Sequence, residues 1–186
     1  MAIATITAGK KSWTYEDYAR LDDDKRYEVI AGELLMAPAP GSFHQDVSAN
    51  LHFLLLDHVR KLRLGKVLAA PLDVILDKQN VVQPDLVFIA RANQSIIQSH
   101  GITGKPEAVI EIISNASVQR DRIRKKALYE RFEIPEYWLV DPASRTIEIL
   151  TLAEGRYQPF AFATEKGKIK SQVISGLELD LTEIFS

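Results

Sequence analysis

Arg26 and Glu28 alternate with apolar residues before Ala31 and Gly32, and the run Glu33–Ala37 after them is apolar beyond its first residue. A period of two residues is typical of β-strands. A two-residue turn that ends in glycine suits a tight hairpin, because glycine accepts a positive φ. We therefore expect an N-terminal β-hairpin with strands over residues 26–30 and 33–37.

Helical signals occur on either side of this hairpin. Thr14 and Asp17 have the spacing of a capping box, which predicts a short helix to about Leu21. From residue 42 the apolar positions recur every three or four residues, which predicts a helix over 42–64 with Gly65 as its C-terminal cap. These positions are Val47, Leu51, Leu54, Leu55, Val59 and Leu62.

The remaining patterns predict strands and one more helix. We expect strands over residues 67–70, 72–76, 85–89, 108–114 and 137–141, a hairpin-like pair over 147–152 and 157–163, and a short terminal segment over 179–185. The second long helix is expected over about 118–132. This order of elements indicates an α/β (α+β) fold, a mixed β-sheet flanked by helices.

Composition limits the functions that such a fold can have. The 186 residues are expected to form one domain, 1–186, in which residues 1–11 are a flexible N-terminal segment. The formal net charge of −2 gives no overall positive field, so any nucleic-acid contact must come from a local patch. The absence of cysteine excludes thiolate zinc sites, iron–sulfur clusters and cysteine nucleophiles. We find no export signal and no apolar run of membrane-spanning length, and expect a cytoplasmic protein without a membrane partner.

Two carboxylates stand out against their apolar surroundings. Glu111 interrupts the apolar run over 108–113, where an unpaired charge would cost several kcal/mol. An Arg or Lys partner in a structural ion pair, an alternating strand with one wetter face, or a functional role would each explain it. Asp85 opens the apolar run over 86–89 and would lie at the mouth of a strand, although for this residue alone a turn aspartate is the better explanation. Asp73 is a similar acid in a third strand.

The helix after Glu111 offers a cation for these acids. At about 100° per residue, one stripe of this helix contains Asp121, Lys125, Leu128, Tyr129 and Phe132. Lys125 therefore shares a face with apolar residues, whereas Lys126 lies about a quarter-turn away and should face solvent.

Two acids and a lysine can support metal-dependent hydrolysis. Mg²⁺ takes oxygen ligands, usually one or two carboxylates together with phosphate and water. The metal lowers the pKa of a bound water and stabilises negative charge on a phosphate, and a lysine can orient the water or neutralise the charge. Asp85, Glu111 and Lys125 could do this together.

Motifs in a fixed order resemble the Uma family of endonucleases, part of the PD-(D/E)xK restriction-endonuclease-like superfamily. The resemblance covers roughly residues 14–180. It rests on Arg26–Glu33, His44-Gln45, Gln83-Pro84-Asp85, Val109–Ser114 around Glu111, Asp121-x-x-x-Lys125-x-x-x-Tyr129, and Pro135–Pro142.

The resemblance implies a restriction-endonuclease-like core. It also implies that Asp85 and Glu111 hold Mg²⁺ or Mn²⁺, with the carbonyl of Ile112 as a further ligand. One position departs from the superfamily pattern, because Ile113 stands where a lysine normally follows the glutamate. The family-type substitute is a lysine on the following helix, which here is Lys125.

Other residues are secondary candidates for the site. Glu28 lies in the hairpin, and His44 opens the long helix and could approach a metal or a phosphate. Gln83, Asp121 and Tyr129 belong to the motifs that carry the resemblance. Basic residues suited to phosphate contacts are Arg120, Arg122, Arg124 and Lys126 on the second helix, and Arg60, Lys61, Arg63 and Lys66 at the end of the first.

The leading interpretation is a metal-dependent endonuclease that hydrolyses DNA phosphodiester bonds. The alternative is a catalytically inactive module of the same fold that binds nucleic acid or protein, which Ile113 and the near-neutral charge favour. A homodimer is expected by analogy, because a duplex has two strands to cut. Hydrolases of other classes lack support, since the chain has no Gly-x-Ser-x-Gly, His-Glu-x-x-His or phosphate-binding loop motif.

Overall fold

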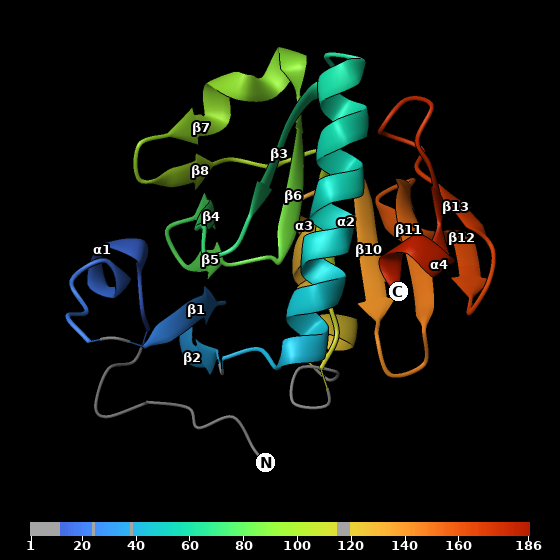
Figure 1. The fold of residues 1–186 in the computed structure, drawn as a ribbon. Coiled ribbons are helices and arrows are strands. Elements are labelled where there is room, and N and C mark those ends of the chain that lie inside the picture. The colour runs from blue at the N-terminus through green and yellow to red at the C-terminus, as the bar shows by residue number, and fades with distance from the viewer. Residues whose placement is uncertain (1–11, 24, 38, 115–119) are drawn as a thin grey trace.

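Two six-stranded sheets make up most of the computed structural model, which describes residues 12–23, 25–37, 39–114 and 120–186 (Figure 1). Within those residues the first sheet has the strand order β2-β1-β5-β4-β8-β7, and we call it the N-terminal sheet. Its strands are β1 (Arg26–Ile30), β2 (Glu33–Ala37), β4 (Val74–Asp77), β5 (Asn80–Val82), β7 (Ile97–Gln98) and β8 (Gly101–Thr103).

The second sheet, which we call the central sheet, has the order β12-β11-β10-β9-β6-β3. Strands β9 and β10 run parallel and every other neighbouring pair is antiparallel, so the sheet is mixed. Its strands are β3 (Gly65–Ala69), β6 (Leu86–Ala90), β9 (Ala108–Ile112), β10 (Glu136–Asp141), β11 (Thr146–Ala153) and β12 (Arg156–Thr164). A small pair, β13 (Lys168–Lys170) and β14 (Glu178–Asp180), follows.

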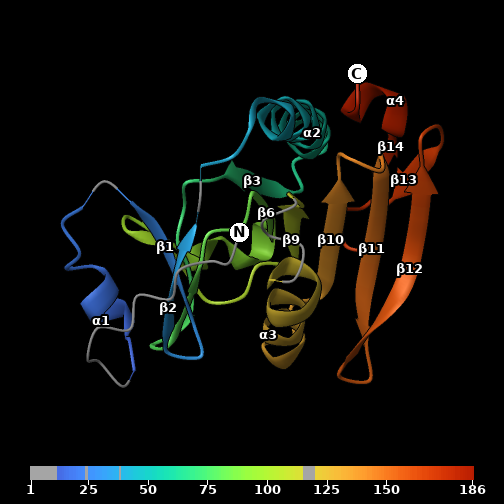
Figure 2. The ribbon, with the colours of Figure 1, turned by 90° about the horizontal axis from the view of Figure 1, so that it is seen from below.

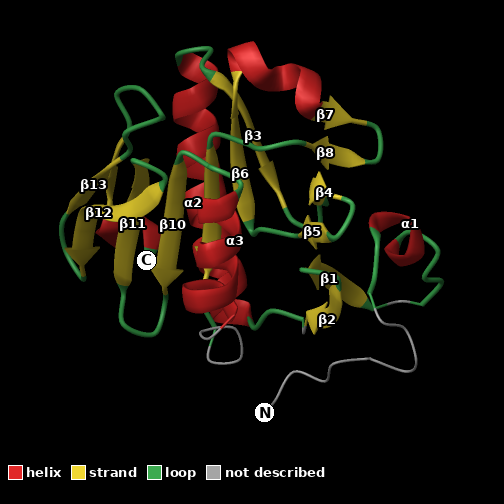
Figure 3. Ribbon diagram, turned by 180° about the vertical axis from the view of Figure 1, so that it is seen from behind, coloured by secondary structure: helices red, strands yellow, loops and turns green. Residues whose placement is uncertain are grey.

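Helices cover both faces of the central sheet (Figure 2). The long helix α2 (Ser42–Lys61) lies on one face and buries the stripe of Val47, Leu51, Leu55 and Val59 against it. On the other face lies a π-helical turn, η2 (Arg120–Lys125), that continues into α3 (Lys126–Arg131), as Figure 3 shows from behind. The shorter helices are α1 (Tyr15–Tyr18), η1 (Arg91–Ile96) and α4 (Leu181–Ile184).

The two cores follow from the alternation of side chains along the strands. In β9, Ile110 and Ile112 pack on the α2 side, whereas Val109 and the following Ile113 pack on the α3 side. Glu111 has the same parity as Val109, so its side chain is directed to the α3 side. In the described residues, no helix is long and apolar enough to cross a bilayer.

Most of the expected long elements are present. The hairpin has the expected strands, and its turn residues Ala31 and Gly32 have φ values of 51° and 76°. The capping box at Thr14 and Asp17 is formed, although α1 ends at Tyr18. The expected strands over 67–70, 72–76, 85–89, 108–114 and 137–141 correspond to β3, β4, β6, β9 and β10, with ends that differ by at most two residues.

The expected C-terminal cap of the long helix is wrong. The helix ends at Lys61, and Arg63 adopts the left-handed conformation with φ 55°. Gly65 instead begins β3, where a Cβ atom would collide with the carbonyl oxygen of Ile89 on β6. The glycine therefore serves close strand pairing.

Several short elements were not expected, namely β5, β7, β8, β13 and η1. The expected second helix over 118–132 is divided into η2 and α3, and its first two residues lie outside the described part of the chain, as does the expected flexible segment 1–11. The terminal segment over 179–185 contains a strand end and α4.

Candidate metal and nucleic-acid site

Glu111 lies in the middle of the central sheet, with β6 and β10 on either side of it. Only 3% of the residue is exposed. Its carboxylate oxygen Oε1 accepts a hydrogen bond from the Tyr129 hydroxyl at 2.6 Å and lies 2.8 Å from the Lys125 ammonium. The cation that the sequence required for this buried acid is therefore Lys125.

The stripe expected on the second helix is confirmed. Asp121 and Lys125 are each 1% exposed, and Leu128 and Tyr129 pack beside them. Ile123, off the stripe, is 60% exposed. Lys126 lies outside the buried set, as expected. The stripe survives the π-helical turn because Asp121 and Lys125, four residues apart, still share one side of it.

Lys125 also joins the site to the N-terminal sheet. Its Nζ lies 2.8 Å from Oε1 of Glu28 on β1 and 3.9 Å from Asp121 Oδ1. Glu28 Oε1 accepts a further hydrogen bond from the backbone N–H of Gln83 at 2.9 Å. Arg120 lies near both acids, with Nε 3.6 Å from Glu28 Oε2 and 3.4 Å from Asp121 Oδ1.

Asp85 comes opposite Glu111 because β6 and β9 are antiparallel with Leu86 paired to Ile110. Its oxygen Oδ2 accepts a hydrogen bond from the backbone N–H of Ile112 at 2.7 Å. The same oxygen lies 3.4 Å from Nε2 of His44, in the first turn of α2. The residue that precedes β6 and the first turn of α2 thus come together at the Asp85 carboxylate.

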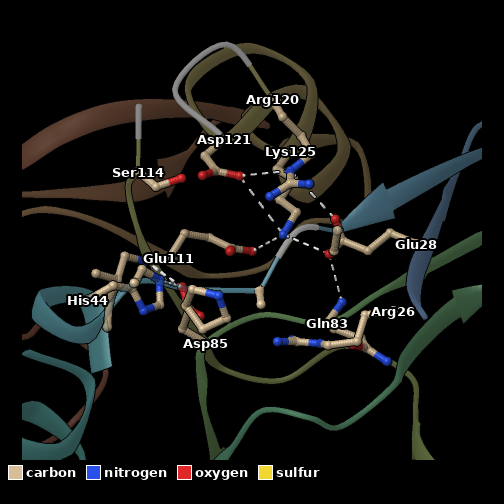
Figure 4. Close-up of a pocket in the computed structure, with 15 residues that line it drawn as sticks. Arg26, Glu28, His44, Gln83, Asp85, Glu111, Ser114, Arg120, Asp121 and Lys125 are labelled. Atoms are coloured by element: carbon tan, nitrogen blue, oxygen red, sulfur yellow. Dashed lines mark hydrogen bonds and ion pairs between the residues drawn. The ribbon is translucent and has the colours of Figure 1, made fainter. Parts of the chain in front are cut away.

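These groups line one pocket with a volume of about 300 Å³. In Figure 4, Glu111 and Lys125 point toward each other between His44 and Asp85 on one side and Glu28 on the other. Of the expected site residues, those that line the pocket are Glu28, His44, Gln83, Asp85, Glu111, Ile112, Arg120, Asp121 and Lys125. Tyr129 lies behind Glu111 and holds its carboxylate.

Three expected DNA contacts lie outside the pocket. Arg122 is paired with Glu148 at 3.2 Å, and Arg124 is paired with Glu33. Lys126 does not line the pocket either. The basic cluster at the end of α2 starts sixteen residues after His44, about 24 Å away at 1.5 Å per residue.

Arg26 lines the pocket but was not among the site residues predicted from the sequence. It lies two residues before Glu28 on β1, and residues two apart on a strand share a face, so Glu28 could have indicated it. Arg26 Nε donates to Gln83 Oε1 at 3.2 Å, and Gln83 Nε2 donates to Asp73 Oδ1 at 2.9 Å. The third strand acid, Asp73, thus belongs to a network beside the pocket.

The pKa values of Glu111 and Glu28 shift in opposite directions because their neighbours differ. Burial raises the pKa of Glu111, Lys125 lowers it, and Asp121 and Asp85 raise it further, with the result near 8. Burial also raises the pKa of Glu28, but Lys125, Arg120 and the Gln83 N–H outweigh it and leave that pKa below its usual value. Burial would lower the pKa of Lys125, whereas its three acidic neighbours raise it.

The donor set suits a hard divalent cation. Asp85 and Glu111 offer carboxylate oxygens from adjacent strands, which Mg²⁺ and Mn²⁺ accept as ligands. No three His, Asp or Glu side chains among the described residues stand ready as a complete metal site. Glu111 Oε1 instead contacts Lys125 and Tyr129, so a metal would share this carboxylate with them.

A match to a family model covers nearly the whole chain. A family model, Uma2, described as "Putative restriction endonuclease", matches residues 15–182. The chain belongs to the Uma2 family. A search of curated proteins found no match.

The fold is also similar to a solved structure. This is the crystal structure of "a putative nuclease belonging to DUF820" from Anabaena variabilis, with a TM-score of 0.75 and 17% sequence identity. The match covers 92% of this chain and 97% of that one. The expected fold class, a mixed sheet flanked by helices in a nuclease-like arrangement, is thereby confirmed.

Proposed function

We propose that this Uma2 protein is a divalent-metal-dependent endonuclease that hydrolyses phosphodiester bonds in DNA. The observation that carries the proposal is the meeting of Asp85, Glu111 and Lys125 at one pocket. The family description and the nuclease that shares the fold support the same class of activity.

Asp85 and Glu111 would hold Mg²⁺ or Mn²⁺, with the Ile112 carbonyl as a further oxygen donor. Bound there, the metal would supply a water of lowered pKa and stabilise charge on the phosphate. Lys125 has its ammonium 2.8 Å from Glu111 and can orient that water or neutralise the developing charge. Tyr129 donates to Glu111 and fixes the direction of this carboxylate.

Lys125 can take the place of the lysine that Ile113 replaces. Ile113 is 4% exposed and packs in the apolar core on the α3 side. Ile113 lies on the same side of β9 as Glu111, two residues along the strand, so this position gives the pocket no cation. The turn η2 brings a lysine to Glu111 from another direction.

Arg26 and Arg120 are the cations suited to contact the DNA backbone. Both line the pocket, and Nη1 of Arg120 is buried without a hydrogen-bond partner in the described part of the chain. A phosphate oxygen would satisfy such a donor. We extend the proposal to a homodimer in the cytoplasm, because two copies would cut both strands of a duplex.

A catalytically inactive nucleic-acid- or protein-binding module is the second candidate. It is favoured by the raised pKa of Glu111, near 8, because a protonated carboxyl binds metal poorly at neutral pH. Metal-dependent cleavage separates the two candidates.

The test is cleavage of supercoiled plasmid and of single-stranded DNA with Mg²⁺, Mn²⁺ or EDTA. We expect cleavage with a metal and none with EDTA, and expect Asp85→Asn and Glu111→Gln to abolish it. Asp57→Asn is the matched control, because Asp57 is an exposed acid on α2 paired with Lys61. Wild-type protein that binds DNA but cuts neither substrate would establish the binding module instead.

A further inference from the structure

His44 is the one imidazole among the described residues that line the pocket, and the mechanism above gives it no role. It lies in the first turn of α2, and its side chain is only 13% exposed. Its Nε2 lies 3.4 Å from Asp85 Oδ2, which is longer than an ordinary N–H···O hydrogen bond of about 2.7–3.2 Å. That oxygen already accepts the Ile112 N–H at 2.7 Å.

Ile112, whose carbonyl is the second expected oxygen donor, lines the same pocket as His44 and Asp85. Its backbone N–H is bonded to the same Asp85 oxygen that lies 3.4 Å from Nε2 of His44, so Ile112 lies beside the ring.

The separation of Nε2 and Oδ2 suits two ligands of one cation. Neighbouring ligands of an octahedral ion at about 2.1 Å are roughly 3 Å apart, close to the observed spacing. The other ring nitrogen, Nδ1, is buried without a hydrogen-bond partner in the described part of the chain. No hydrogen bond at Nδ1 among the described residues fixes the ring, so a shift by the few tenths of an ångström that ligation needs breaks none on that side.

We propose that His44 is a nitrogen ligand of the metal held by Asp85 and Glu111. This inference rests on the proposed function, because it needs the same metal. It adds a consequence for metal choice, since imidazole favours first-row transition ions over Mg²⁺, whose ligands are oxygens. The site then takes Mn²⁺ more tightly than Mg²⁺, and His44 provides the difference.

The test uses Mn²⁺ as the probe and magnetic resonance as the readout. Wild-type protein, His44→Ala, His44→Gln and Glu111→Gln are titrated with Mn²⁺ and Mg²⁺, and electron spin-echo modulation is recorded on the bound Mn²⁺. His52→Ala is the matched control, because His52 lies on the same helix outside the pocket. Labelling with ¹⁵N-histidine identifies the source of any nitrogen modulation.

We expect nitrogen modulation from histidine in wild type and in His52→Ala, and its loss in both His44 variants. Removal of the ligand should weaken Mn²⁺ binding by about tenfold or more and Mg²⁺ binding much less. Mn²⁺ that binds through Glu111 but shows no histidine nitrogen would overturn the role of His44 and leave the metal site intact. Mn²⁺ binding that does not depend on Glu111 would overturn the proposed metal site and this inference with it.

Discussion

Glu28 and Lys125 form a buried ion pair with 2.8 Å between Oε1 and Nζ. Glu28 comes from the first hairpin and Lys125 from the turn that precedes α3, so the pair joins the N-terminal sheet to the helix layer of the central sheet. The ammonium is shared with Glu111 at the same distance. The hairpin is thus part of the pocket and sets the position of its lysine.

Replacement of Lys125 should separate catalysis from general charge. We expect Lys125→Ala to lower the rate of DNA cleavage by a factor of order 10²–10³, because a preorganised cation beside the reacting phosphate is lost. Lys126→Ala removes the same charge one residue along, outside the pocket, and should lower the rate only slightly. Single-turnover cleavage rates measure both, and the reverse order would contradict the assignment of Lys125.

Replacement of Glu28 should weaken the fold as well as the site. Glu28→Ala removes a buried carboxylate that is paired with both Lys125 and Arg120. The free energy of unfolding should therefore fall by about 3–5 kcal/mol. Glu33→Ala, in the same hairpin, breaks a more exposed ion pair and should change it by about 1 kcal/mol or less. Urea denaturation compares the two, and equal effects would show that Glu28 supports no buried pair.

The raised pKa of Glu111 predicts how stability changes with pH. A carboxyl whose pKa is near 8 when folded and near 4.5 when unfolded keeps its proton longer in the folded state, so stability falls as pH rises across this interval. Glu111→Gln removes this loss. In EDTA, its melting temperature relative to wild type should therefore increase between pH 5 and pH 9. A constant difference over that range would mean that Glu111 is ionised throughout.

Metal should stabilise the protein through Glu111. Mg²⁺ or Mn²⁺ binds the native state and should therefore raise the melting temperature. At a metal concentration of a hundred times the Kd, the free energy of unfolding increases by about 2.7 kcal/mol. Glu111→Gln should abolish the rise, and Asp57→Asn, on the exposed side of α2, should keep it. An equal rise in wild type and Glu111→Gln would place the metal elsewhere.

Local patterns were enough to predict the main elements and to single out Asp85, Glu111 and Lys125. Two strand-like runs separated by Ala31 and Gly32 predicted the hairpin, and the apolar run around Glu111 predicted β9. The stripe that put Lys125 inward also held, because the helical phase depends on neighbours in sequence alone. These are properties that a short window of residues determines.

Contacts between distant segments were not predictable in the same way. The pairing of Glu28 with Lys125 depends on how two sheets pack, and the role of Gly65 depends on β6 lying against β3. Glu136 shows why a buried acid alone does not identify a site. It is fully buried in β10, yet it accepts hydrogen bonds from Trp138 and Ser171 and serves the fold.

The π-helical turn η2 carries one consequence for how this chain can change. Its wider winding holds one more residue than an α-helical turn would. Deletion of a single residue before Lys125 could convert it to α geometry while Leu128 and Tyr129 kept their places. Because the turn holds one residue more than an α-turn, this deletion would remove only the extra residue, and Arg120 and Asp121 would keep their direction toward the pocket. The turn η2 is therefore a place where the chain can lose one residue in length while both the charged cluster and the core beneath it are retained.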